Sequence, residues 1–424
     1  MSDSDEPTQL TARDVLRYTN VRRMLGSSFA FYIGVSLQAA TLGKHIFDIS
    51  GRAIDIGLLG LAEFGPIAVL VLISGSVADR FNRKHVAALA LAGEMLCAIA
   101  LVTYSLSEPT AVWPFFVIGV LFGISRAFLS PATRAMYPMV APDRGLSPVI
   151  AMSSGVWTSA MIVGPAASGF LYSAAPWIAY ATTAGLILIG IIGIMRVQFE
   201  REPTPRDPNE KVTLRSAMEG LYFIRRTPIL LAAISLDLFA VLFGGAIALL
   251  PAIAEEQLQV GDVAYGWLRA AAGIGAAAMA LLLSIRPLRR NVGKALLIAV
   301  GVFGLGTIVL GATHTYWIAF AAVLILSAAD MVSVFIRGSI VPLVTPDSKR
   351  GRVSAVENVF IGATNELGAF ESGVASQAFG TPAAVIGGGV ATLGVVGIWW
   401  FGFKPLRNID RFSDLDAPEN PALN

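Results

Sequence analysis

The chain has 424 residues, of which 55% are hydrophobic and only 14% are charged, and its formal net charge is +2. A soluble globular domain carries roughly 25% charged residues, so this composition excludes an ordinary soluble protein. The small net charge does not favour nucleic-acid binding, and a single cysteine excludes an intramolecular disulfide. The three histidines fit no zinc spacing and no Gly-xxxx-Gly-Lys phosphate loop occurs, so we expect neither a metal nor another cofactor.

Long apolar runs recur along the whole chain. A helix that spans a membrane needs roughly 20 mostly apolar residues, because each residue adds about 1.5 Å against a hydrocarbon core of about 30 Å. We therefore predict an all-α integral membrane protein with twelve transmembrane helices. The runs lie near residues 24–47, 54–78, 85–106, 111–136, 147–172, 176–197, 229–253, 263–285, 295–312, 316–340, 353–378 and 381–403. The eleventh run is the most polar, because Glu357, Glu366 and Glu371 interrupt it.

Positive charge is distributed unequally between the two sides of these predicted spans. If the N-terminus is cytoplasmic, the cytoplasmic segments carry 26 of the 31 Lys and Arg residues, and the external segments carry one, Arg52. Cytoplasmic loops of membrane proteins are enriched in Lys and Arg. We therefore predict a multi-pass protein of a bacterial inner membrane with both termini in the cytoplasm, Lys211 inside and Gln257 outside.

A charged, proline-bearing stretch that begins at Phe199 separates the first six spans from the last six. It is typical of a linker between two bundles. The predicted organisation is a cytoplasmic N-terminal tail (1–23), an N-terminal six-helix bundle (24–198), a cytoplasmic linker (199–228), a C-terminal six-helix bundle (229–403) and a cytoplasmic C-terminal tail (404–424).

The two bundles carry an internal repeat. The segment 138–145, after the fourth span, matches the segment 342–351, after the tenth. Pro, Val, Pro and Asp recur at a fixed offset, and Arg-Gly follows in both after a two-residue insertion in the second. Duplicated halves place a substrate site at their interface near the bilayer midplane and allow the halves to rock about it.

The loop after the second span carries Gly75, Asp79, Arg80, Asn82, Arg83 and Lys84. It resembles the signature Gly-xxx-Asp-Arg/Lys-x-Gly-x-Arg/Lys of the major facilitator superfamily, at its expected place, with Asn82 where the second glycine is usual. The resemblance implies the major facilitator fold of two pseudo-symmetric six-helix halves. A loop that is basic only because it faces the cytoplasm is the simpler alternative, but it does not explain the glycine and the aspartate.

By this resemblance the signature residues govern the conformational change. Gly75 permits close helix contact, and Asp79 accepts hydrogen bonds from the N-terminus of the eleventh helix. Asn82 tolerates a left-handed backbone, so we expect the turn to be preserved there. Arg83 and Lys84 are expected to hold the loop in the cytoplasm, close to anionic lipid.

The fifth span contains Gly164 and Pro165, followed by Ser168 and Gly169. The segment resembles the Gly-xxx-Gly-Pro-xx-Gly-Gly motif of the superfamily's exporters, with Ala160 and Ser168 in place of two glycines. Glycine and proline together permit a kink and tight helix packing. The motif implies export, although a purely structural kink explains it equally well.

Further segments resemble one branch of the superfamily, that of the enterobactin exporters. They are 123–132 in the fourth span, 236–245 in the seventh, and 351–357 and 365–373 in the eleventh. The likeness extends over nearly the whole chain. It implies the fold more firmly than the substrate, because members share these segments whatever they carry.

Ionisable side chains inside the predicted spans are candidates for the substrate or proton pathway, because a buried charge costs several kcal/mol unless it is paired or hydrated. They are Lys44, Glu63, Glu94, Arg126, Asp237, Arg269, Asp330, Arg337, Glu366 and Glu371. In the superfamily helices 1, 4, 7 and 10 line the cavity, and this resemblance favours Lys44, Arg126, Asp237 and Asp330. Proton coupling needs a buried carboxylate, and we expect Asp237 and Glu366 to carry the proton.

Several of these groups have a structural alternative. Lys44 and Arg337 lie near helix ends, where a long cationic side chain can extend to the interface without any further role. Glu63 and Glu94 fit a structural network within the first half, and Glu371 fits a position near the outer surface.

The repeat also aligns Arg126 with Asp330 at the same depth in the fourth and tenth helices. In the superfamily these helices approach each other on the cytoplasmic side when the cavity opens outward, so a pair between them would bias the conformational equilibrium. The alternative is that Arg126 pairs with Glu63 or Glu94 within the first half.

We predict from these observations a monomeric secondary active transporter that works by alternating access. Its expected function is proton-coupled export of an amphipathic small molecule, such as a siderophore or drug, in contact with membrane lipids. An importer or lipid flippase of the same fold is the alternative within transport, and a non-transporting sensor is the alternative outside it. An integral membrane enzyme is not favoured, because no Ser/His/Asp set or cytosolic catalytic domain is evident.

We expect Asp79→Asn to impair turnover more than folding, because Asp79 matches the signature loop and is predicted to cap the eleventh helix. The measurement compares transport in proteoliposomes with the amount of protein in the membrane. Wild-type transport by a normally expressed Asp79→Asn protein would remove this role.

Overall fold

The computed structural model describes residues 10–199 and 214–415, except the side chains of residues 71, 72, 75, 76, 78, 79, 214–217, 347 and 348. Every regular element in this part of the chain is helical, which confirms the predicted all-α class. The expectations for Lys211, and for the surroundings of Gly75 and Asp79, lie outside the described residues.

The first half follows the predicted spans closely. Pro176 begins its last helix at the first helical position, where a missing N–H costs nothing. Gly51, with φ of 60°, ends its first long helix in the left-handed conformation that glycine adopts freely. The elements are α1 (Ala12–Val15), α2 (Thr19–Ser50), α3 (Ala53–Arg80), α4 (Arg83–Leu106), α5 (Trp113–Val140), α6 (Leu146–Ala174) and α7 (Pro176–Met195).

The second half departs from the prediction at three places: a helix lies in the linker, the seventh span is broken, and the eleventh helix begins at Asp347 rather than near residue 353. The elements are α8 (Leu214–Arg226), α9 (Pro228–Phe243), η1 (Gly245–Ile247), α10 (Leu250–Ala252), η2 (Ile253–Gln257), α11 (Asp262–Ile285), α12 (Val292–Ala312), α13 (Tyr316–Val344), α14 (Asp347–Phe379), α15 (Thr381–Gly402), α16 (Lys404–Arg407) and η3 (Phe412–Leu415).

Eleven helical stretches within the described residues are long and apolar enough to cross a membrane. They correspond to all the predicted spans except the eleventh. That span is α14, a continuous helix of 33 residues whose charged side chains keep it outside this set. Its polarity has a structural reason, because α14 packs against α3, α8, α9 and α15 and so faces protein on several sides.

The predicted span 229–253 is not one helix. α9 ends at Phe243, and short 3-10, α and π turns continue the path. Gly245 permits the break: a Cβ built there would lie 2.5 Å from the carbonyl oxygen of Gly368, so the backbone packs directly on α14. Pro251 lacks the N–H that a continuous helix needs. Unwound backbone at this depth is tolerated only where protein or a cavity surrounds it.

The repeat is visible in where α5 and α13 end. Both helices end at the aligned valines, Val140 and Val344, and the next residue is extended, with ψ of 129° at Ala141 and 120° at Thr345. A proline follows each of them, and proline disfavours the helical conformation of the residue before it. The same local chemistry therefore ends the fourth long helix of each half.

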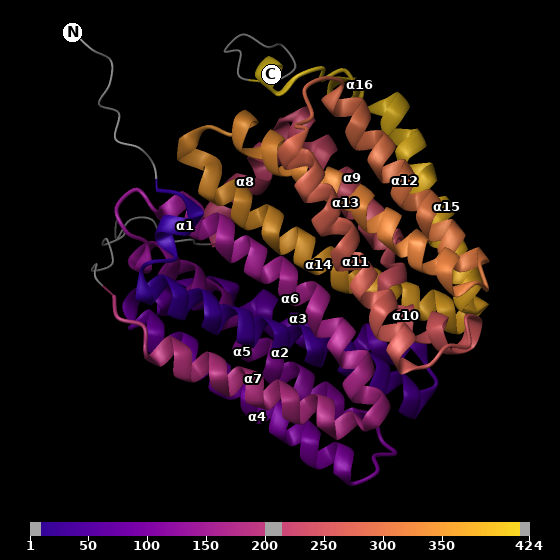
Figure 1. Cartoon of the computed structure of the whole chain (residues 1–424). Helices are drawn as coiled ribbons and strands as arrows, with labels where there is room; N and C mark the ends of the chain where they lie inside the picture. The colour runs from indigo at the N-terminus through magenta and orange to yellow at the C-terminus, as the bar shows by residue number, and fades with distance from the viewer. Residues whose placement is uncertain (1–9, 200–213, 416–424) are drawn as a thin grey trace.

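The helices form two bundles that are joined along two seams (Figure 1). Helices α2–α7 pack on one another, as do the helices from α9 to α15, while α3 contacts α14 and α6 contacts α11 across the division. We call the end that carries α1, α8 and α16 the tail end, and the end with Gly51 and η2 the far end. Figure 1 shows the bundles converging near α10 and diverging toward α1 and α16.

Glycines set how closely the bundles approach at the far end. A Cβ on Gly57 of α3 would lie 2.6 Å from the Cα of Phe370 in α14. A Cβ on Gly169 of α6 would lie 2.9 Å from the Cα of Gly266 in α11. Both distances are far below any ordinary carbon–carbon contact, so only glycine permits the backbones to meet. The two halves are thus closed on each other at the far end.

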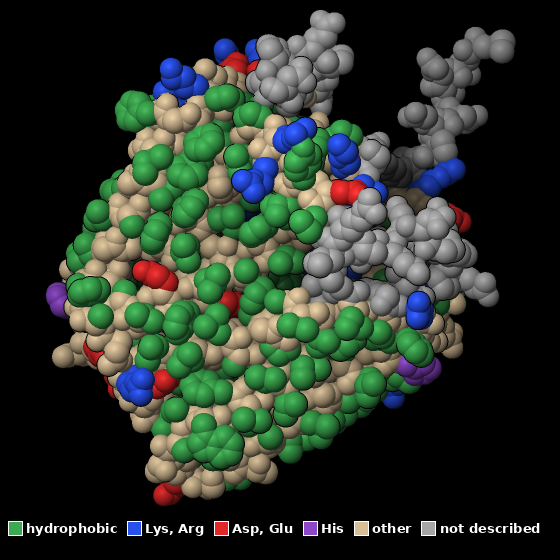
Figure 2. Space-filling model, turned by 180° about the vertical axis from the view of Figure 1, so that it is seen from behind, with side chains coloured by type: hydrophobic (Ala, Val, Ile, Leu, Met, Phe, Trp, Pro, Cys, Tyr) green, Lys and Arg blue, Asp and Glu red, His purple; other side chains and the backbone are tan. Residues whose placement is uncertain are grey.

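The outer surface is that of a protein surrounded by lipid. Figure 2 shows hydrophobic side chains spread over the visible face, with most of the visible Lys and Arg gathered toward the tail end. Leu89, Trp317 and Phe401 are between 73% and 76% exposed. Such exposure is unfavourable in water and normal against a hydrocarbon core.

Labelling of single cysteines in a Cys97→Ala background tests the orientation. Gln257 is unsuitable, because it is buried and donates to the carbonyl oxygen of Leu310 at 3.0 Å. Gln259 at the far end and Arg289 at the tail end are exposed. With an impermeant thiol reagent on intact cells, we expect Gln259→Cys to react and Arg289→Cys to react only after the membrane is opened. The reverse pattern would overturn the predicted topology.

Candidate functional site

Five ionisable side chains gather where the two halves meet, and we call them the central cluster. Glu63 and Arg126 form an ion pair of 3.4 Å between α3 and α5, and the Arg126 guanidinium also lies 5.4 Å from the Phe122 ring centroid. The predicted pair between Arg126 and Asp330 is not formed in this structure, which instead has the first-half alternative. The members are Glu63 (α3), Glu94 (α4), Arg126 (α5), Arg269 (α11) and Glu366 (α14).

The central cluster crosses the division between the halves. Arg126 and Arg269, one from each half, both lie close enough to Glu63 and Glu366 to interact with them electrostatically. The carboxylate of Glu366 lies against the backbone of Gly60, in the space that a Cβ at position 60 would occupy. A larger residue at position 60 would therefore displace the Glu366 carboxylate. Any rotation of one half against the other must therefore change the distances between these charges.

Glu94 is the least compensated member of this cluster. It is fully buried, and neither carboxylate oxygen has a hydrogen-bond partner within the described part of the chain. Arg126 and Glu63 are near enough to act on it electrostatically. Gln38 of α2 is likewise fully buried with an unpartnered side-chain amide. Burying such groups without partners is unfavourable. The side chains of Glu94 and Gln38 are therefore available to form hydrogen bonds with a ligand, and Glu94 is available to bind a proton.

A second group, the C-half cluster, lies within the other bundle. Arg337 of α13 forms ion pairs with Asp237 of α9 and, at 3.3 Å, with Glu357 of α14. Asp330, two turns before Arg337 on α13, lines a void of about 10 Å³ together with Asp237 and Ser333. A void of that size holds about one water molecule. The structure thus brings together Asp237 and Asp330, two of the predicted site residues.

A third group, the far-end latch, joins the halves where they converge. The ammonium of Lys44 on α2 forms ion pairs with Asp48 on the same helix, with Glu255 of η2 at 3.0 Å and with Asp262 of α11 at 3.5 Å. Tyr172 of α6 donates to Asp48 at 2.6 Å. Lys44 is 7% exposed and Arg337 is 5% exposed, so neither side chain merely extends to the interface. The ammonium of Lys44 links the two bundles, because it belongs to the first half and pairs with Glu255 and Asp262 of the second.

The predicted exporter motif in α6 lies between the two bundles. A Cβ on Gly164 would lie 2.7 Å from the Cβ of Ser36 on α2, and the backbone carbonyl of Pro165 packs against Gly266 of α11. Ser168 shares a hydrogen bond of 3.1 Å with Thr41 of α2. The motif therefore lets α6 pack tightly on a helix of its own half and on one of the other half.

The loop after α3 differs in one respect from the expectation. Asn82 is not left-handed: its φ is −63° and ψ is 111°, and its side chain caps α4 by accepting from the Lys84 backbone N–H at 3.0 Å. The ammonium of Lys84 donates to the Val197 carbonyl at 2.9 Å beyond the end of α7. Arg83 contacts the Met139 sulfur at 3.6 Å, and the Arg80 side chain is exposed. This loop thus ties α4 to the ends of α5 and α7.

Sequence reasoning missed several partners of these charges. Asp48 follows Lys44 by four residues, a spacing that places both on one helix face and that could have been used. Glu255 and Asp262 gave no such indication, because their pairing with Lys44 depends on the broken path after α9. Glu357 was noticed only as an interruption of the eleventh span. Glu371 lies toward the far end of α14 and accepts from Ser372 at 3.5 Å. Among the described residues no group of three His, Cys, Asp or Glu side chains is placed to hold a metal.

Two helical bundles with an apolar surface and charges clustered between them define a multi-pass membrane transporter of the major facilitator type. The chain matches the model of the transmembrane secretion effector family of these transporters over residues 13–421, and it belongs to that family. The family consists of transporters and not of enzymes.

The chain is similar to several efflux-type transporters. It is 25% identical to the multidrug efflux pump Tap of Mycolicibacterium fortuitum over 395 residues, which cover 89% of this chain and 92% of that one. It is 26% identical to macrolide efflux protein A of Streptococcus pyogenes over 209 residues, 47% of this chain and 50% of the relative. With the uncharacterised MFS-type transporter YfiS of Bacillus subtilis (strain 168) the identity is 28% over 280 residues, 64% and 63% of the two chains. The last two alignments span only about half to two thirds of those relatives. The narrower resemblance to enterobactin exporters stays a prediction.

Solved structures confirm the fold. A bacterial homologue of the human lysosomal transporter Spinster, inward-facing and unoccupied, superposes with a TM-score of 0.69 at 16% identity, covering 92% of this chain and 96% of that one. A D-xylose-proton symporter superposes with a TM-score of 0.68 at 13% identity, with coverages of 92% and 99%. At these identities the likeness establishes the major facilitator fold and nothing about substrate.

We expect Lys44→Met to loosen the far-end latch, because it removes the cation that three carboxylates share. Ala40 is a suitable reporter, since it is fully buried and its carbonyl accepts from Tyr265 of the other half at 3.0 Å. In a Cys97→Ala background, Ala40→Cys should react with a thiol reagent about fivefold faster when Lys44→Met is added, as the loss of about 1 kcal/mol of pairing implies.

The matched control is Arg52→Gln, which also removes a far-end cation but one whose ion-pair partner among the described residues is Asp55 of its own half, at 3.8 Å. Equal reactivity of position 40 in the Lys44→Met and Arg52→Gln proteins would show that Lys44 does not hold the halves together.

Proposed function

We propose that this protein is a secondary active exporter that carries an amphipathic small molecule out of a bacterial cell by alternating access. The observation that carries the proposal is the central cluster, whose charges come from both halves and lie beside a seam that rocking would open. Relatives named for multidrug and macrolide efflux favour a drug-like substrate over a siderophore. The exporter-type motif in α6 agrees with this direction.

The proposed orientation places the tail end in the cytoplasm of a cell with a bacterial inner membrane. The excess of Lys and Arg on that side supports it, because such residues are retained on the cytoplasmic face. With the far end closed by the latch and by the glycine contacts, the structure then corresponds to the state that receives its substrate from inside. Opening outward requires Lys44 to leave Glu255 and Asp262, and tail-end contacts between the halves to replace them.

The proposed coupling ion is the proton, and the C-half cluster is where it binds. Within the described residues this cluster has three carboxylates, Asp237, Asp330 and Glu357, and one cation, Arg337. One guanidinium cannot neutralise three carboxylates, of which Asp237 is buried and the other two are partly buried, and an uncompensated charge inside the membrane costs several kcal/mol. A proton shared by Asp237 and Asp330 through the water-sized void removes the surplus. Glu366 in the central cluster is the second proposed proton carrier, where protonation would change the attraction of Arg126 and Arg269.

In this mechanism substrate and proton compete through the position of α14. Glu366 and Glu357 lie on this one helix, so the central cluster and the C-half cluster share a rigid element. Protonation of Asp237 releases it from Arg337 and leaves Glu357 of α14 as the remaining charged partner of that guanidinium, and substrate in the central cluster displaces the partners of Glu366. Either event shifts the equilibrium between the conformation closed at the far end and the conformation closed at the tail end. Coupling of substrate to proton requires such a shift.

Transport in proteoliposomes tests the proposal, with the full-length protein and a macrolide among a panel of amphipathic drugs as probe. We expect wild-type protein to accumulate the drug when a proton gradient is imposed. Asp330→Asn should abolish gradient-driven accumulation and keep drug-for-drug exchange, because exchange needs no net proton movement. Glu371→Gln is the matched control, a carboxylate outside both clusters, and should behave as wild type.

Binding of the drugs without flux in the wild-type protein would favour a sensor and contradict the proposal. Gradient-driven accumulation that persists in both Asp330→Asn and Glu366→Gln would remove these residues as proton carriers while leaving export intact.

A further inference from the structure

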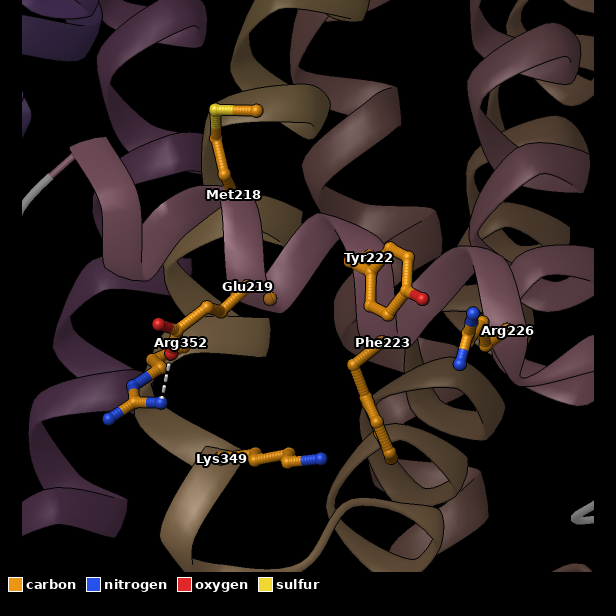
Figure 3. Close-up of a pocket in the computed structure, with 8 residues that line it drawn as sticks. Met218, Glu219, Tyr222, Phe223, Arg226, Lys349 and Arg352 are labelled. Atoms are coloured by element: carbon orange, nitrogen blue, oxygen red, sulfur yellow. Dashed lines mark hydrogen bonds and ion pairs between the residues drawn. The ribbon is translucent and has the colours of Figure 1, made fainter.

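A hollow of about 960 Å³ opens at the tail end, away from all three charge clusters. Figure 3 shows the side chains that line it, which come from α8 and from the start of α14. It is lined by Met218, Glu219, Gly220, Tyr222, Phe223 and Arg226 of α8 and by Lys349 and Arg352 of α14. Neither the transport cycle nor the family match assigns a role to this hollow.

The wall formed by α8 is fixed in place. A Cβ on Gly220 would lie 2.8 Å from the carbonyl oxygen of Arg352, so the α8 backbone packs closely on α14. Ile224 is 3% exposed and anchors the same face of α8 in the core of the second half. Glu219 forms an ion pair with Arg352 (Figure 3). This pair neutralises one of the three cations around the hollow.

Two cations remain, and both lie over aromatic rings. The Arg226 guanidinium is 4.2 Å from the ring centroid of Tyr222, and the Lys349 ammonium is 4.6 Å from that of Phe223. Within the described residues neither cation has a carboxylate partner. Each is held at one side of the hollow by its ring and keeps its N–H donors for another acceptor.

The same hollow has an apolar rim. Met218 is 63% exposed and Tyr222 is 55% exposed on the outward face of α8. One residue, Thr227, separates α8 from the first membrane-spanning helix of the second half, so α8 lies at the boundary between lipid and water. An amphipathic helix with cations and exposed aromatic or aliphatic side chains at this depth is typical of contact with lipid headgroups. The occupant that matches this chemistry has a negative head and an apolar tail.

We propose that the hollow binds the phosphate headgroup of an anionic phospholipid from the leaflet at the tail end, with Arg226 and Lys349 as the phosphate ligands. The phosphate accepts from a cation of α8 and a cation of α14, and the acyl chains lie along Met218 and Tyr222. Because α14 carries Glu357 and Glu366, a lipid in this position ties the linker to the helix that connects the two charge clusters. This site is independent of the substrate and of the direction of transport.

The experiment measures lipid binding to purified full-length protein by native mass spectrometry, with phosphatidylglycerol and phosphatidylcholine as probes. Wild-type protein should retain phosphatidylglycerol in preference to phosphatidylcholine. The double variant Arg226→Gln/Lys349→Gln should bind phosphatidylglycerol roughly thirtyfold more weakly, since each basic residue near an anionic lipid contributes about a factor of five. Arg226→Gln alone should show about a fivefold loss, which keeps the test valid if the double variant is poorly folded.

The matched control is Arg289→Gln/Lys294→Gln, which removes the same charge from exposed positions at the same end but outside the hollow. An equal loss of phosphatidylglycerol in this control, or no preference over phosphatidylcholine in the wild type, would overturn the proposal. Displacement of the lipid by millimolar inorganic phosphate, with the same dependence on Arg226 and Lys349, would show a site for free phosphate and likewise overturn the lipid assignment.

Discussion

A charged side chain inside an apolar helical bundle is stable only when another charge, a hydrogen bond or water compensates it. This constraint organises the interior of the protein, because most of the ionisable groups predicted inside the spans are found in three clusters rather than spread along the spans. The C-half cluster lies within one bundle. The far-end latch and the central cluster draw their members from both bundles, so their electrostatic energy depends on how the halves are arranged. A conformational change that separates the halves must provide new partners or water for these groups.

The helix α14 connects these arrangements. It contacts α3 across the seam, packs on α8 and α9, and carries Glu357 for one cluster and Glu366 for another. Its polarity follows from those contacts, because a helix that supplies partners to buried charges cannot be as apolar as one that faces lipid. The unwound segment after α9 serves the same connection: Gly245 packs on α14, and the path then leads to Glu255 in the latch. A shift of α14 would therefore affect the two clusters to which it contributes and, through the segment after α9, the far-end latch.

Glycine determines where the halves can touch. Gly57, Gly169 and Gly266 bring backbones together at the far end, where a side chain of any size would hold them apart. Close backbone packing gains dispersion energy without the desolvation cost that charges carry, and in a membrane it is a main source of helix association. The closed end thus combines a tight apolar seam with one buried ion network. The seam gives the state its stability, and the network makes that stability dependent on charge.

The sequence by itself determined the class of fold and the approximate limits of most spans, because apolar length acts locally and can be recognised without a structure. The helices α5 and α13 continue to Val140 and Val344, beyond the predicted ends near residues 136 and 340. The sequence also identified most of the buried charges as exceptional. What it could not determine was which charge meets which. Arg126 was aligned with Asp330 by the repeat but pairs with Glu63, and Lys44 is bound by Glu255 and Asp262, more than 200 residues away. The break after Phe243, the helix α8 and its hollow were also missed. Such features depend on how helices distant in sequence approach one another, and that is set by packing between glycine-rich surfaces rather than by any local pattern.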